Sequence, residues 1–202
     1  MARKLIMVRH GNLGEALPGR YIGRTDAPLS AGGRREAGTL AGEFARWNGA
    51  HILCSPLERC RETARIVLGG REGFTVDADL REIDFGLWEG MSFAEIAAGY
   101  PEAVAQWAAL DEGFAFPGGE PITAFTGRIV ALAGRIAADP AETVVTVSHG
   151  GVIRMLICHF LGLGIKSLRL FDIDTASVSV LRIENGRGVL ALLNSRRHLG
   201  EN

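Results

Sequence analysis

Short apolar runs alternate along this chain with longer segments of helical periodicity. Residues 5–8, 51–54 and 143–147 form runs of four or five positions dominated by apolar side chains, without strict alternation. This pattern is typical of strands buried on both faces of a parallel sheet. A fourth short run, at residues 74–76, predicts another strand. The pattern therefore favours an α/β fold with a largely parallel central sheet.

Helix start signals and helical spacing mark the segments between these runs. The signals are Ser30 as an N-cap, Ser55-Pro56 as an N-cap followed by proline at the first helical position, a capping box from Ser92 to Glu95, and Pro101 at a helix start. Apolar positions at helical spacing predict further helices over residues 122–136 and 151–161. Helices are thus expected to alternate with the strands along the chain.

The C-terminal segment predicts an antiparallel edge. Residues 170–173 and 178–183 have the composition of strands, and Asn185-Gly186 is a turn signal. Residues 189–193 then complete a hairpin at the sheet edge. Together with the preceding elements, this predicts a mostly parallel sheet with a hairpin at its edge.

Composition narrows the class of protein. The chain has 202 residues, which fits one domain, and its formal net charge of −1 provides no basic field for nucleic acid or an anionic membrane. The three cysteines are an odd number without metal-ligand spacing, which favours free thiols in a reducing compartment. The apolar run near the N-terminus is too short for a signal-peptide core or a membrane span. We therefore expect a cytoplasmic protein.

Three of the predicted strands end in residues capable of chemistry. The first is followed by Arg9, His10 and a glycine, the second by Ser55 with Arg59 one turn further on, and the third by Ser-His149-Gly-Gly. Ligands of open α/β sheets bind outside the carboxyl ends of the strands, so these side chains are expected to converge. Guanidinium forks bind phosphate oxygens, and a helix N-terminus beyond the third strand adds donors. The sequence predicts a phosphate site that needs no metal and no cofactor.

Nucleophilic catalysis by His10 would require a neutral imidazole. Nearby arginines lower the pKa of a histidine and would keep it neutral. The leaving group needs a proton, and three carboxyl groups lie in one segment as candidates: Glu82, Asp84 and Glu89.

Several other polar and aromatic residues have a structural interpretation. Helical periodicity does not choose between Arg59 and Arg61 as the phosphate ligand. His51, His159 and His198 are interpreted as structural or solvated. Trp88 and Trp107 are expected in the core or in a lid, and the cysteines are expected to be inert.

Four segments of the chain resemble the motifs of the histidine phosphatase superfamily, the phosphoglycerate mutase-like proteins. The segments are residues 5–11 with Arg9-His10-Gly11, residues 55–64 with Arg59, residues 80–90 with Glu82, and residues 147–154 with His149. Residues 21–30 resemble the substrate loop of the family. The motifs occur in order over nearly the whole chain, which makes the resemblance specific.

This resemblance implies an α/β three-layer sandwich of the phosphoglycerate mutase-like kind, in which helices flank a mostly parallel central sheet. It also implies a phosphohistidine intermediate on His10, and it selects Arg59 over Arg61 and Glu82 as the acid. It assigns phosphoryl binding to Arg9, Arg59 and His149, places Asn12, Gly23 and Gly150 in contact with substrate, and makes residues 90–120 a helical cap over the site. The chain departs from the family pattern at three positions. Many members have Glu or Gln at the position of Asn12 and Asn at the position of Ala16, and mutases usually have Ser or Thr at the position of Ile22. The departure at Ile22 favours a phosphatase over a mutase.

The tail Leu193-Asn194-Ser195-Arg196 is similar to that of bacterial α-ribazole phosphatases. The resemblance implies a metal-independent phosphomonoesterase for α-ribazole 5′-phosphate, in the assembly of cobalamin. Alternatives are a cofactor-dependent phosphoglycerate mutase, a broad-specificity small-molecule phosphatase and, outside enzymes, a module that only binds phosphorylated ligands. The expected partner is a small phosphomonoester, and the chain is expected to form a homodimer if it assembles.

Overall fold

A six-stranded sheet forms the centre of the computed structural model, which describes residues 3–14, 19–44, 47, 49–109 and 111–200. Its strand order is β3-β2-β4-β1-β5-β6. The strands are β1 (Arg3–Arg9), β2 (His51–Cys54), β3 (Thr75–Val76), β4 (Thr143–Ser148), β5 (Val178–Glu184) and β6 (Arg187–Ser195). The first four strands pair in parallel, and β5 and β6 add an antiparallel edge. The predicted largely parallel sheet and its C-terminal hairpin are both confirmed.

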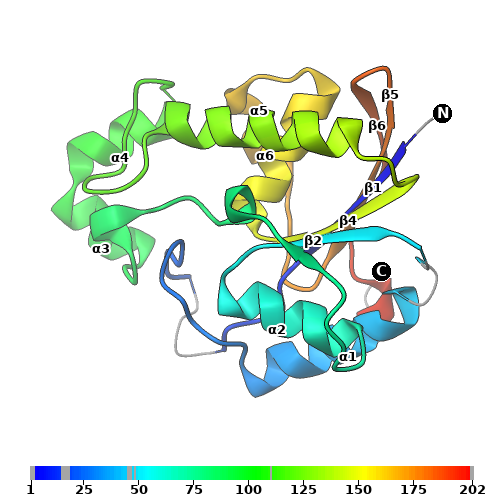
Figure 1. Ribbon diagram of the computed structural model, residues 1–202. Helices are drawn as coiled ribbons and strands as arrows, with labels where there is room; N and C mark the ends of the chain where they lie inside the picture. Colours follow the sequence, from blue (N-terminus) through cyan, green and yellow to red (C-terminus); the bar gives the residue numbers. More distant parts are fainter. Residues whose placement is uncertain (1–2, 15–18, 45–46, 48, 110, 201–202) are drawn as a thin grey trace.

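Helices cover both faces of this sheet (Figure 1). The helices are α1 (Ala31–Phe44), α2 (Glu58–Val67), α3 (Phe93–Gly99), α4 (Pro101–Ala108), α5 (Ile122–Ala138) and α6 (Gly150–Leu161), with 3₁₀ turns η2 (Ala78–Leu80), η3 (Gly86–Trp88), η4 (Ile165–Leu170) and η5 (Arg197–Leu199). Side chains alternate along β1, so Ile6 and Val8 pack with α1 and α2, whereas Leu5 and Met7 pack with α5 and α6. This arrangement confirms the three-layer prediction.

Three predicted helix starts are confirmed, two of them by their capping hydrogen bonds. The Ser30 hydroxyl accepts from the Gly33 amide at 3.0 Å. Ser92 and Glu95 make both bonds of a capping box at the start of α3. Pro101 occupies the first turn of α4, where a missing N–H costs nothing.

The predicted start of α2 at Ser55 and Pro56 is wrong by two residues. The helix begins at Glu58, with Leu57 as its N-cap. The Ser55 hydroxyl lies 2.8 Å from Nε2 of His149, and its contact with the Leu57 amide is longer, at 3.4 Å. The Ser55 hydroxyl, which the local pattern assigned to helix capping, therefore bonds to His149 at the end of another strand.

The strand predicted at residues 170–173 is also wrong. Its first residue ends η4, and the residues after it form an irregular loop. The carbonyls of Phe171 and Ile173 accept hydrogen bonds from the side chains of Arg154 and Arg9. Arginine side chains thus take the place of a neighbouring strand and hold the loop beside the end of β1.

The register of the sheet brings two motif histidines together. Arg9 pairs with Ser148 across β1 and β4, and the His10 amide donates to the Ser148 carbonyl at 3.0 Å. The residues that follow each strand, His10 and His149, are consequently neighbours, with ring centroids 5.1 Å apart.

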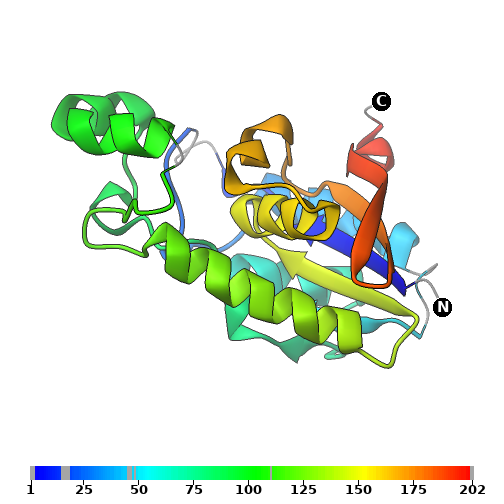
Figure 2. The ribbon, with the colours of Figure 1, turned by 90° about the horizontal axis from the view of Figure 1, so that it is seen from above.

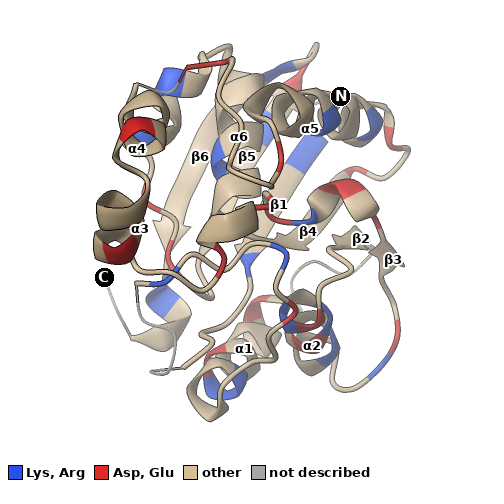
Figure 3. Ribbon diagram, turned by 90° about the vertical axis from the view of Figure 1, so that its left-hand side faces the viewer, with Lys and Arg blue, Asp and Glu red and all other residues tan. Residues whose placement is uncertain are grey.

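Helices α3 and α4 stand to one side of the sheet, beyond one end of α5 (Figure 2). They lie within residues 90–120, the segment expected to form a cap. In the view of Figure 3, acidic and basic residues are interspersed along α1 and α2, in keeping with the net charge of −1. Within the described ranges of the chain, no helix is both long and apolar enough to cross a membrane.

Candidate active site

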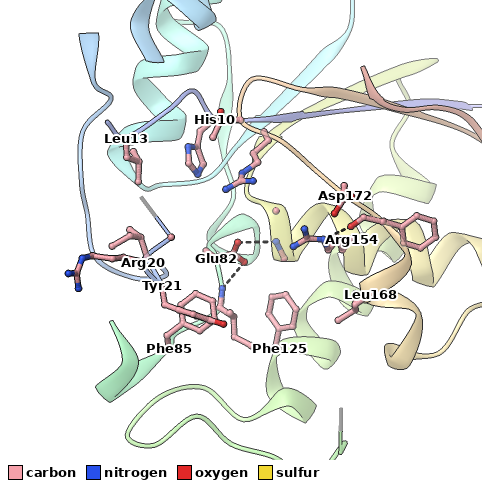
Figure 4. Close-up of a pocket in the computed structure, with 18 of the residues that line it drawn as sticks. His10, Leu13, Arg20, Tyr21, Glu82, Phe85, Phe125, Arg154, Leu168 and Asp172 are labelled. Atoms are coloured by element: carbon pink, nitrogen blue, oxygen red, sulfur yellow. Dashed lines mark hydrogen bonds between the residues drawn. The ribbon is translucent and has the colours of Figure 1, made fainter. Parts of the chain in front are cut away.

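A pocket of about 810 Å³ opens at the carboxyl ends of β1 and β4. Its polar lining includes Arg9, His10, Glu82 and Arg154, which come from the end of β1, the segment after η2, and α6. Figure 4 shows His10, Glu82 and Arg154 directed toward a common space. The remaining wall is largely apolar and aromatic: Leu13, Tyr21, Ile22, Ile83, Phe85, Trp107, Phe116, Ile122, Phe125, Leu168 and Phe171.

His10 is held in a defined tautomer. Its Nδ1 lies 2.8 Å from the carbonyl oxygen of Gly11, and because a carbonyl only accepts, Nδ1 carries the hydrogen. The lone pair is therefore on Nε2. The loop that carries the ring is anchored by the Gly11 amide, which donates to Thr63 at 3.2 Å.

Burial lowers the pKa of His10 well below the ordinary value of 6.5, and the charges of Arg59 and Arg9 lower it further. The lowered pKa makes the ring neutral near pH 7. The residue is 5% exposed and lines the pocket. A neutral imidazole with a free Nε2 lone pair is the form that can act as a nucleophile.

Arg59 is fully buried and is not among the residues that line the pocket. Its guanidinium donates to the carbonyls of Gly23 and Thr25 at 2.7 and 2.8 Å, and its Nε donates to Nδ1 of His149 at 3.2 Å. With Nδ1 accepting, Nε2 of His149 carries the hydrogen and donates to Ser55 at 2.8 Å. Both nitrogens of His149 thus have protein partners, and the ring orients Arg59. Direct binding of a phosphoryl group by His149 stays a prediction, and it requires the ring to exchange one of these partners for a phosphoryl oxygen.

Geometry separates the three candidate carboxyl groups. Glu82 lines the pocket, where its two oxygens accept from the amides of Ile83 and Gly151 at 3.0 and 2.9 Å. Asp84 accepts from the Gly86 amide in a turn, and Glu89 accepts from the amides of the loop at residues 23–25. Glu82 is therefore the carboxyl group placed to meet a leaving group. A Cβ at Gly151 would lie 2.5 Å from Glu82 Oε1, so a larger residue there would displace the Glu82 carboxyl group.

Of the three residues expected to contact substrate, Asn12 and Gly150 line the pocket and Gly23 does not. The Asn12 amide oxygen accepts from the Gly14 amide at 2.5 Å. Gly23 contributes its carbonyl to Arg59, and a Cβ there would lie 2.1 Å from the Ile83 carbonyl. Ile22 is part of the apolar pocket wall. Ala16 lies outside the described residues.

Two parts of the site were missed by sequence reasoning. Arg154 lines the pocket from the first turns of α6, and its place four residues after Gly150 on one helix face was an available signal. The loop at residues 171–177 was missed because its partners are distant in sequence. Asn194 holds this loop in place: its side chain accepts a hydrogen bond from the Asp174 amide at 2.6 Å and donates one to the Asp174 carboxylate at 2.8 Å. The tail motif thus reaches the site through this loop.

The residues given a structural interpretation lie mostly outside the pocket. His51 pairs with Asp139, and Trp88 is fully buried. Trp107 is the exception, because it lines the pocket from α4. All three cysteines are buried, and burial raises the pKa of Cys60 to about 12 and of Cys158 to about 11. Across the residues that the structure describes, no three His, Cys, Asp or Glu side chains are grouped so that they could hold a metal ion.

The site combines the neutral His10, the half-buried Arg9, the buried Arg59 and the carboxyl group of Glu82 near the strand ends of an α/β sheet. This combination suits a phosphoryl-transfer enzyme. The sequence model of the histidine phosphatase superfamily (branch 1) matches residues 5–196. The chain therefore belongs to this superfamily, as the motifs predicted.

Individual relatives carry different substrate names. Phosphoserine phosphatase 1 of Hydrogenobacter thermophilus is 34% identical over 200 residues, which cover 98% of this chain and 95% of the relative. The adenosylcobalamin/α-ribazole phosphatase of Salmonella typhimurium is 33% identical over 195 residues, which cover 96% of each protein. The crystal structure of the α-ribazole phosphatase of Shigella flexneri superposes with a TM-score of 0.84 at 31% identity, and the match covers 96% of each chain. The family is thus shared by enzymes with different leaving groups.

The buried histidines are expected to make folding stability decrease as the pH falls below about 6.5. Burial, followed by the charge of Arg59, lowers the pKa of both His10 and His149 well below that value. Between the two pKa values the unfolded chain binds a proton that the native protein does not, so each histidine stabilises the native state fully above pH 6.5 and progressively less below it. The slope is at most about 1.4 kcal/mol per pH unit for each histidine.

Urea unfolding between pH 7 and pH 5 measures this dependence. His10→Gln removes one of the two groups, so its unfolding free energy should change less steeply with pH than that of the wild type. Equal slopes for the two proteins would contradict the assignment of His10 as a buried neutral group.

Proposed function

We propose that this protein hydrolyses phosphomonoesters through a covalent phosphohistidine on His10, without a metal ion. The observation that carries the proposal is the state of His10: a neutral ring with its Nδ1 hydrogen bonded to the Gly11 carbonyl and its Nε2 lone pair free at the pocket. Arg9 and Arg59 supply positive charge beside this atom, where a transferring phosphoryl group carries negative charge.

The proposed reaction has two steps. Nε2 of His10 attacks phosphorus and forms the N–P bond, while the bond from phosphorus to the ester oxygen breaks and Glu82 donates a proton to that oxygen. Water then attacks phosphorus while Glu82 takes a proton from the water and the N–P bond breaks, which releases inorganic phosphate and restores His10. Glu82 thus acts first as an acid and then as a base.

We favour α-ribazole 5′-phosphate as the substrate. The pocket beyond His10 is walled by the aromatic rings of Tyr21, Phe85 and Phe125 among others, and such a wall suits a flat apolar heterocycle. In this proposal α4 contributes Trp107 to the wall, so that residues 90–120 act as a cap over the leaving group. The relatives named for α-ribazole support the same choice.

Phosphoserine is the second candidate. A phosphoserine phosphatase is among the relatives, at 34% identity. Arg154 and Asp172 also stand on the pocket wall with opposite charges, an arrangement that could bind the carboxylate and ammonium groups of an amino acid. The two candidates differ in whether the aromatic wall or this charged pair binds the leaving group.

A panel of phosphomonoesters, each assayed with and without EDTA, tests the proposal. The panel contains α-ribazole 5′-phosphate, phosphoserine, 3-phosphoglycerate and p-nitrophenyl phosphate. We expect hydrolysis unaffected by EDTA, the highest kcat/KM for α-ribazole 5′-phosphate, and acid-labile phosphate on the protein after an acid-free quench. Production of 2-phosphoglycerate faster than phosphate release would instead indicate a mutase. Tight binding of the panel without turnover or a trapped intermediate would indicate a binding module.

A further inference from the structure

We infer that Glu89 is a positioning residue that fixes the guanidinium of Arg59 through the loop at residues 23–25. The inference rests on the proposed function, in which Arg59 provides charge to the phosphoryl group. Glu89 lies at the end of η3 and is separated from Arg59 by this loop. Its carboxylate is surrounded by donors from the loop, and the carbonyls of the same loop face Arg59.

The carboxylate accepts hydrogen bonds from three consecutive backbone amides. The Arg24 amide donates at 2.8 Å, the Gly23 amide at 3.1 Å and the Thr25 amide at 3.2 Å. The Thr25 hydroxyl donates to the same carboxylate at 2.6 Å, and the Phe85 amide donates at 3.3 Å. Consecutive amides that converge on one anion form a concave anion-binding arrangement, which holds a charged carboxylate more strongly than a neutral amide.

The connection to Arg59 runs through a single peptide group. The Gly23 carbonyl accepts from Arg59 Nη2 at 2.7 Å, and the Arg24 amide of the same peptide unit donates to Glu89 at 2.8 Å. A trans peptide is planar, with its oxygen and hydrogen on opposite sides, so fixing one side fixes the other. The Thr25 carbonyl accepts from Arg59 Nη1 at 2.8 Å, which gives a second contact of the same loop.

Arg59 depends on these acceptors for its orientation. Three of its five N–H groups are used by Gly23, Thr25 and His149, and the proposed function assigns the other two to a phosphoryl group. The side chain is fully buried, so a change in the loop carbonyls would redirect the guanidinium. Misplacement of a charged donor by about 1 Å can cost on the order of 100-fold in rate. Glu89 itself contacts the loop rather than the reacting atoms, so it acts only through Arg59.

Glu89→Gln tests the inference, because the amide has nearly the same shape but places an NH₂ group against backbone N–H donors. We expect kcat/KM to fall by about 10- to 100-fold and orthovanadate inhibition to weaken in parallel. The loss should be similar for α-ribazole 5′-phosphate and p-nitrophenyl phosphate, because the leaving-group wall is unchanged. Thr25→Val, which removes one bond to Glu89, should show a smaller loss of the same kind and serves if Glu89→Gln does not fold.

Glu62→Gln is the matched control, since Glu62 accepts from the Leu29 amide further along the same loop. Its activity should remain at the wild-type level. A double-mutant cycle with Arg59→Lys should be non-additive, because a structural effect alone would add to the loss of Arg59. Wild-type kcat/KM and vanadate affinity in folded Glu89→Gln, or full additivity in the cycle, would overturn the inference. Failure to trap phosphate on wild-type His10 would instead count against the proposed function. The vanadate titration does not require a phosphoenzyme, so it tests the role of Glu89 separately.

Discussion

His10→Ala is expected to lower kcat by about 10⁴-fold or more and to abolish the phosphoenzyme. Removing the nucleophile of a covalent mechanism leaves only binding and electrostatic stabilisation, and comparable deletions cost on the order of 10⁴- to 10⁶-fold. The arginine charges remain in this variant, so affinity for vanadate should persist. Single-turnover assays with labelled substrate measure the rate and the trapped phosphate in one experiment.

His159→Gln is the control for this prediction. His159 lies near the last turn of α6, well away from the start of that helix at Gly150. This variant should retain wild-type kcat and the acid-labile phosphate. Turnover by His10→Ala within tenfold of the wild type, or phosphate trapped on it at wild-type stoichiometry, would contradict a nucleophilic role for His10.

Glu82→Gln is expected to slow the hydrolysis of alkyl phosphates by roughly 10²- to 10⁴-fold, the usual contribution of a general acid. Its effect on the first step should be much smaller for p-nitrophenyl phosphate, whose leaving group departs without a proton. The second step also loses its base. A burst of p-nitrophenol followed by slow turnover should therefore appear, because the phosphoenzyme forms and then hydrolyses slowly.

Stopped-flow measurement of the burst provides the test, and Asp84→Asn is the matched control. Asp84 belongs to the same segment but accepts from the Gly86 amide in a turn. It should show wild-type kinetics with both substrates. Equal losses for alkyl and p-nitrophenyl esters, without a burst, would mean that Glu82 has a structural role only.

The strand ends were the most predictable part of this protein. Apolar runs identify β1, β2 and β4 because a strand buried on both faces has no polar face to interrupt it. Parallel strands then carry their C-terminal residues to one edge, so His10 and His149 could be expected together before the register was known. The register, with Arg9 opposite Ser148, shows the reason for their contact.

Local pattern was misleading where a distant residue supplied the hydrogen-bond partner. Ser55 has the composition of a helix cap, but its hydroxyl bonds to His149. Residues 170–173 have the composition of a strand, but the side chains of Arg9 and Arg154 take two of their carbonyls. In each case a contact across many residues of sequence outweighed a weak local preference.

By itself, the sequence determined the α/β class, the order of the motifs and the set of groups available for phosphoryl chemistry, because these follow from hydrophobic periodicity and residue type. Only the tertiary structure decided how those groups are used. It placed Glu82 at the pocket and Glu89 behind a loop, although both belong to one short segment. It also left the Nε2 lone pair of His10 free while occupying both nitrogens of His149. Hydrogen bonds between segments distant in the chain make these choices, and no local pattern contains them.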